Sequence, residues 1–211
     1  MLRSFSVVLC VVTLLFAASG YAAVHMFGFD IFTNNGMYND DPGANFYFLL
    51  SDEGGLAKFE FHNESTFASC ITRVYFDGDV LSGIASIDQS SGVLFSIDGA
   101  PSNLPAGNEL MPPFVADFSV SANPPPSFNG INNSLTEWLA VTMNLSSGKS
   151  FNDVYEALIN AELRVGIHIQ AFPDGSSESA YNPPEEIIPE PSIMSLLGLA
   201  GLGLIWKKRK K

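Results

Sequence analysis

The chain has 211 residues and a mass of 22.7 kDa, which is room for one ordinary domain plus terminal signals and excludes a multidomain machine. Hydrophobic residues make up 46% of it and charged residues only 15%, with 13 Pro and 18 Gly. That composition is too apolar for a disordered chain and too often interrupted for a bundle of long helices. We therefore expect a β-rich globular domain.

The acidic residues all lie in the middle of the chain. The net charge is −12, but six of the ten basic residues lie close to the two ends. The stretch between those ends has four basic and 22 acidic residues, which is a formal charge of −18. Such a surface repels phosphate groups, so it excludes nucleic acid and disfavours anionic lipid headgroups as partners of the domain.

Residues 1–22 have the three parts of a secretory signal peptide. Arg3 makes the start positive, residues 7–18 are apolar, and small residues lead to a cleavage site after Ala22. We therefore expect export of the protein, with signal peptidase and the export machinery as its first partners.

Residues 23–181 alternate apolar and polar side chains in short runs between turn residues, as antiparallel strands do. The clearest strands are predicted at residues 58–61, 93–97, 114–120, 139–145 and 163–170. The whole stretch holds about eight to ten such strands, so we predict a mainly β domain with two packed antiparallel sheets, a β-sandwich or jelly roll.

The alternation also assigns side chains to the core. One strand should place four apolar side chains on the same face: Phe114, Ala116, Phe118 and Val120. Cys70 should share its face with Thr72, Val74 and Phe76. Because Cys70 is the only cysteine after the signal peptide, no intrachain disulfide can form, and we expect a buried, unreactive thiol.

One short helix is predicted between the last two long strands, at residues 151–160. Ser150 is its N-cap, and Asp153 three residues later completes a variant of the capping box. Apolar residues recur at helical spacing, so one face of this helix should pack on a sheet.

The end of the chain has a linker followed by three ordered elements. Residues 182–188 are predicted to be an extended, acidic, proline-rich linker. The three elements are the motif Pro189, Glu190 and Pro191, an apolar segment from Ser192 to Trp206, and the basic run Lys207, Lys208, Arg209, Lys210 and Lys211. As a helix the apolar segment is about 22 Å long, short of the ~30 Å hydrocarbon core, so we expect only transient insertion into the inner membrane. The basic run should remain on the cytoplasmic side.

This tail, residues 189–211, resembles the PEP-CTERM sorting signal of exported bacterial proteins. The resemblance implies recognition by an exosortase, a membrane protease that cuts near the Pro-Glu-Pro motif and releases or transfers the ectodomain to the cell surface or extracellular matrix. It also implies a Gram-negative host that makes extracellular polysaccharide. The resemblance covers only the tail and assigns no site in the domain.

The domain itself carries no motif that indicates a cofactor or a catalytic centre. His25, His62 and His168 lack metal-ligand spacing, and no nucleophile, phosphate-binding or dinucleotide-binding motif is present. Calcium is the one metal for which acidic loops exist, at 40–41 and 52–53, although neither loop has EF-hand spacing. Metal binding therefore stays open.

These features favour a non-enzymatic exported protein with a structural or adhesive role at the cell surface or in the matrix. A carbohydrate-binding module of the exopolysaccharide matrix is one alternative, which exposed Tyr or Trp on one sheet face would favour. A secreted hydrolase is the other, which a polar cleft with two facing carboxylates would favour.

Overall fold

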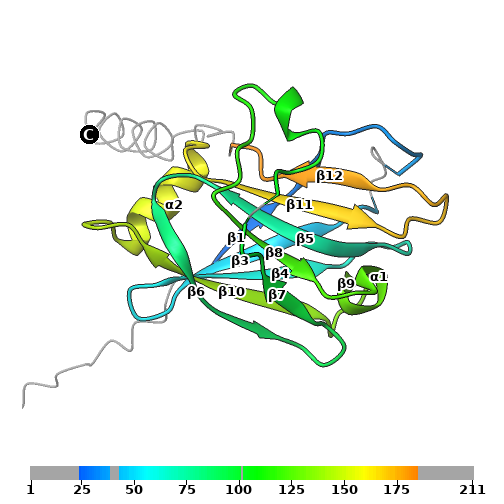
Figure 1. Ribbon diagram of the computed structural model, residues 1–211, viewed down its shortest axis with the longest axis horizontal. Coiled ribbons are helices and arrows are strands. Elements are labelled where there is room, and N and C mark those ends of the chain that lie inside the picture. Colours follow the sequence, from blue (N-terminus) through cyan, green and yellow to red (C-terminus); the bar gives the residue numbers. More distant parts are fainter. Residues whose placement is uncertain (1–23, 39–42, 101, 185–211) are drawn as a thin grey trace, which may run out of the picture.

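The computed structural model describes residues 24–38, 43–100 and 102–184. The predicted signal peptide, the 40–41 loop, most of the linker and the whole sorting tail lie outside these residues. The fold is mainly antiparallel β, with 43% strand, 10% helix and two sheets, which confirms the predicted fold class (Figure 1).

The first sheet, sheet A, has five antiparallel strands in the order β1-β3-β4-β10-β6. Their bounds are β1 Val24–Gly28, β3 Phe46–Asp52, β4 Ala57–Asn63, β10 Trp138–Leu145 and β6 Leu81–Gln89. β10 is inserted between β4 and β6, far from either in sequence.

The second sheet, sheet B, has the order β2-β12-β11-β5-β8-β7, and β9 also pairs with β5. Its strands are β2 Asp30–Ile31, β12 Glu178–Tyr181, β11 Arg164–Gln170, β5 Cys70–Asp77, β8 Phe118–Ala122, β7 Phe95–Ile97 and β9 Ile131–Asn132. Because β1 and β2 are consecutive but lie in different sheets, the first segment of the domain crosses from one sheet to the other.

The core between the sheets is rich in phenylalanine. Phe59 of sheet A meets Phe76 of sheet B with ring centroids 5.1 Å apart, nearly edge to face. Phe61 meets the same ring at 6.2 Å, and all three side chains are completely buried. Since aromatic rings bury large apolar areas, this cluster contributes strongly to the contact between the two sheets.

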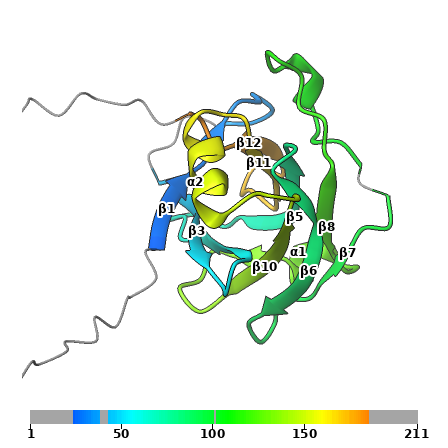
Figure 2. The ribbon, with the colours of Figure 1, turned by 90° about the vertical axis from the view of Figure 1, so that its left-hand side faces the viewer.

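The predicted helix is α2, Phe151–Ile159, and it closes one end of the sandwich (Figure 2). Ser150 and Asp153 form a reciprocal capping box, as predicted. The helix ends one residue earlier than predicted, at Ile159. Val154 and Leu158 are buried in the core between the sheets, so the amphipathic face packs as expected. The other helices, α1 (Pro126–Asn129) and the 3-10 helix η1 (Gly107–Glu109), are single turns within loops.

Two predicted strands begin later than expected. β7 begins at Phe95 instead of residue 93, and β8 begins at Phe118 instead of residue 114. The backbone N–H groups of Val115 and Ala116 donate to side chains instead of a neighbouring strand. Residues 114–117 therefore form a loop, and Phe114 lies outside the core between the sheets, in a separate cluster.

The predicted face of Cys70 is also wrong, because β5 contains a bulge. His168 pairs with Arg73, whereas the next residue of β11, Ile169, pairs with Ile71, so Thr72 is an extra residue. Beyond that point the side chains swap faces. Ile71 therefore lies in the main core, and Cys70 is buried outside it.

Candidate functional site

The outer face of sheet B is partly covered by a loop that we call the strap, residues 98–117, of which residue 101 is outside the description. Leu104 and Phe114 of the strap pack on Tyr75 and form a second, smaller hydrophobic cluster. Gly166 makes this approach possible, because a Cβ there would lie 2.9 Å from the Leu104 side chain. Large side chains of the strap thus cover this part of the outer face of sheet B.

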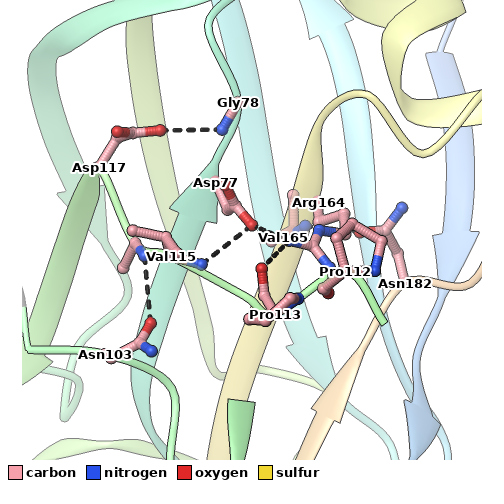
Figure 3. Close-up of polar contacts among 11 residues, drawn as sticks. Asp77, Gly78, Asn103, Pro112, Pro113, Val115, Asp117, Arg164, Val165 and Asn182 are labelled. Atoms are coloured by element: carbon pink, nitrogen blue, oxygen red, sulfur yellow. Dashed lines mark hydrogen bonds and ion pairs between the residues drawn. The ribbon is translucent and has the colours of Figure 1, made fainter. Parts of the chain in front are cut away.

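One buried ion pair holds the strap in place (Figure 3). Arg164 pairs with Asp77 and also donates to the carbonyl oxygens of Pro112 and Pro113, both at 2.7 Å. The guanidinium lies 5.2 Å from the centre of the Phe114 ring. Arg164 is on the outer face of β11, but it is only 8% exposed because the strap covers it. The N–H groups of the guanidinium therefore donate to acceptors within the protein.

Further contacts fasten the C-terminal end of the strap. Asp77 also accepts from the Val115 N–H at 3.1 Å, and Asp117 accepts from the Gly78 N–H at 3.0 Å. Within the strap, Asn103 accepts from the Ala116 N–H at 3.1 Å. Figure 3 shows these side chains converging from β5, β11 and the strap. This network stabilises a loop, and we assign it no ligand.

The outer face of sheet A is different, since no described segment crosses its middle strands (Figure 2). Three ring-bearing side chains form one cross-strand row there, which we call the aromatic row: Tyr47 on β3, His62 on β4 and Trp138 on β10. The strand registers place His62 directly opposite both Tyr47 and Trp138. All three are partly exposed. Sequence reasoning named His62 only as a histidine without metal spacing and did not identify the row.

Polar groups surround the aromatic row. The Tyr47 hydroxyl donates to the Glu64 carboxylate at 2.6 Å. Glu60 lies 3.1 Å from the His62 Nε2 atom and 3.2 Å from the Lys58 ammonium group. The row therefore combines ring surface with hydrogen-bonding groups that remain partly open to water.

The Tyr47 hydroxyl offers a spectroscopic test of this arrangement. Burial, followed by the hydrogen bond to Glu64 and the negative charge there, raises the pKa of Tyr47 from 10.0 to about 12. We expect Tyr47 to ionise only near pH 12 in an absorbance titration at the phenolate band, and its contribution is identified by its loss in Tyr47→Phe, because burial raises the pKa of Tyr75 as well. Replacing Glu64 with Gln should move that ionisation to lower pH. If instead the ionisation of Tyr47 stays at the same pH in Glu64→Gln, the Glu64 contact does not hold the phenol proton.

The small residue Ala140 lies next to Trp138 on the same face of β10. Ala140 is paired in register with Glu60 on β4. Ala140 is only 2% exposed, so larger neighbouring side chains cover its methyl group. Among the described rings, Tyr47 and His62 are stacked, with centroids 4.9 Å apart and planes 16° apart. Trp138 has no such ring partner in the described part of the chain.

The histidines and acidic loops do not assemble a metal site in the described part of the chain, where no group of three candidate ligands comes together. His25 contacts the Tyr155 ring of α2 at 4.1 Å, and His168 is opposite Arg73 on the outer face of sheet B. Asp52 accepts from the Gly55 N–H at 2.7 Å and so caps the turn between β3 and β4.

An acidic pocket of about 480 Å³ lies beside α2, lined by Asp79, Asp153, Glu156, Glu162 and Lys149 among others. Asp153 is already used in the capping box, and hydrogen bonds from Ser150 lower its pKa. A glycosidase needs one carboxyl group whose pKa is raised, so that it stays protonated and acts as the acid. The shift at Asp153 is the opposite, so Asp153 is not suited to be that acid.

Cys70 is buried and free, as predicted. Burial, with a smaller contribution from the charge of Glu137, raises the pKa of its thiol to about 12. In the protein without residues 1–22, which include Cys10, we expect no reaction with a water-soluble disulfide reagent at pH 8 when it is folded, and complete reaction after unfolding in urea. Rapid labelling of the folded protein would mean that the Cys70 region opens readily.

The sorting residues predicted from the sequence can be assessed only by comparison, because residues 189–211 lie outside the described structure. No helix among the described residues is long and apolar enough to cross a membrane. Residues 188–210 match the family of the PEP-CTERM protein-sorting motif. Neither the curated proteins nor the solved structures yield a match to the chain. The chain thus carries the C-terminal exosortase sorting signal, which marks it as an exported protein recognised by an exosortase.

Proposed function

We propose that this protein is a non-enzymatic, structural or adhesive component of the cell surface or extracellular matrix. In this proposal, signal peptidase removes residues 1–22, the tail inserts transiently into the inner membrane, and an exosortase then releases or transfers the β-sandwich. The observation that carries the proposal is the sorting motif at residues 188–210, joined to a domain of high negative charge.

One observation favours the carbohydrate-binding alternative, in which the protein adheres to the matrix by binding polysaccharide. Partly exposed Tyr47 and Trp138 lie on the same face of sheet A, which is the feature expected of a β-sandwich that binds sugars. Extracellular polysaccharide would then be the partner that retains the released domain in the matrix. No comparable observation favours a hydrolase.

Sorting is tested by the intact mass of the protein recovered from the surface and medium of its native host, with an exosortase-deficient strain beside it. We expect loss of the signal peptide in both strains, and loss of the region after Pro191 only when exosortase is present. A triple substitution of Pro189, Glu190 and Pro191 by Ala should keep the protein in the membrane fraction, whereas a Glu185→Gln, Glu186→Gln linker variant should be processed normally. An uncut wild-type tail in the membrane fraction would overturn the proposal.

A further inference from the structure

We propose that the aromatic row on sheet A binds a single extended chain of a neutral, β-linked polysaccharide. The Trp138 indole provides the stacking surface, and the Tyr47–His62 pair continues the contact across the sheet. This inference rests on the carbohydrate-binding form of the proposed function and assigns it a site and a class of ligand.

The ring geometry identifies Trp138 as the principal contact. Because Tyr47 and His62 are stacked on each other at 4.9 Å, one face of each ring is already covered. The indole of Trp138 has no aromatic ring stacked on it within the described part of the chain. Of the three rings, it is therefore the one with no face covered by another ring. The C–H groups on one side of a pyranose carry partial positive charge, and they suit the negative face of an aromatic ring.

The spacing of the row suits a polymer that lies across the strands. Neighbouring strands are about 4.8 Å apart, which is close to the length of one sugar in an extended chain, so the three strands of the row span about two sugars. The row follows a straight line, because His62 is paired directly with Tyr47 on one side and Trp138 on the other. A straight β-linked chain can follow this line, whereas a coiled α-linked chain cannot.

Charge around the row selects a neutral chain. Glu60 and Glu64 lie beside it, and among the described residues Lys58 is the lysine that pairs with Glu60. Their carboxylates can accept hydrogen bonds from sugar hydroxyls, which are donors as well as acceptors. The same carboxylates, on a domain whose middle stretch has a formal charge of −18, repel the carboxylates of an acidic polysaccharide.

The test uses the fluorescence of Trp138. The chain has two tryptophans, so in a full-length Trp206→Phe variant the emission comes from Trp138 alone. The protein is kept in a zwitterionic detergent without sugar headgroups and is titrated with hydroxyethyl cellulose, which is neutral and β-linked. Carboxymethyl cellulose has the same backbone with negative charge, and soluble starch is neutral but α-linked. We expect a saturable change in emission with hydroxyethyl cellulose and at least tenfold weaker responses to the other two.

Substitutions then test the site by affinity electrophoresis in gels that contain hydroxyethyl cellulose. Trp138→Ala should weaken retardation by about tenfold, the effect expected for loss of one stacked aromatic contact. Trp138→Phe keeps a ring and should retain part of the binding, and it covers the case in which the alanine variant fails to fold. Phe128→Ala is the matched control, because Phe128 is 77% exposed on α1 beside the other sheet.

Three results would overturn the assignment: no response of the wild-type site to hydroxyethyl cellulose, equal retardation of Trp138→Ala and Phe128→Ala, or tighter binding of carboxymethyl cellulose. If any of these occurs while the mass measurement still detects exosortase-dependent release, the ligand assignment fails and the structural or adhesive function stands. If release fails but hydroxyethyl cellulose still binds, the ligand assignment stands and the proposed release by exosortase fails.

Discussion

Replacement of Arg164 by Met is expected to lower the free energy of unfolding by about 3 kcal/mol, because it leaves a buried carboxylate without its partner. The side chains of Arg164 and Asp77 are only 10% and 17% exposed. The substitution also removes the donors to Pro112 and Pro113, whose carbonyl oxygens then lose their hydrogen bonds. The strap should open locally as well.

Urea unfolding of the full chain in detergent, followed by circular dichroism, measures this loss. The matched control is Lys58→Met, which breaks an ion pair whose side chains are 30% and 26% exposed and should cost less than about 1 kcal/mol. Limited proteolysis of Arg164→Met should cut within residues 98–117 first. Adding Asp77→Asn should restore part of the stability, since no unpaired charge is left. Equal effects of the Arg164 and Lys58 variants would contradict the role assigned to the strap network.

Replacement of Phe76 by Ala should have an effect at least as large, about 3–5 kcal/mol, because it leaves a cavity where the two sheets meet. Phe76 is completely buried and packs against the edges of Phe59 and Phe61 from the opposite sheet. The surrounding strands are paired on both sides, so they cannot collapse far into the space.

The same urea experiment measures this variant, with Phe128→Ala as the control. Phe128 is 77% exposed, and its truncation should change the stability by no more than about 0.5 kcal/mol. A Phe76→Ala protein as stable as the control would mean that the phenylalanine cluster does not join the sheets as described.

The sequence alone determined the features that depend on neighbouring residues. Helix α2 was predicted to within one residue, because Ser150 and Asp153 satisfy each other's backbone groups locally. The class of fold followed from the alternation of apolar and polar residues. The sorting signal was recognised because its three elements are consecutive along the chain, and the match to residues 188–210 confirms it.

The tertiary structure alone decided the features that depend on distant residues. Residues 114–120 alternate like a strand, but the first part is a loop. Phe114 belongs to the strap and packs on Tyr75, and the strap is held by Arg164 and Asp77, which lie 87 positions apart. The bulge at Thr72 likewise reversed the predicted face of Cys70. Alternation specifies which face of a strand a side chain occupies but not which strand lies beside it. The aromatic row exists only because β10 pairs with β4, and that order of strands is a property of the packed sheets.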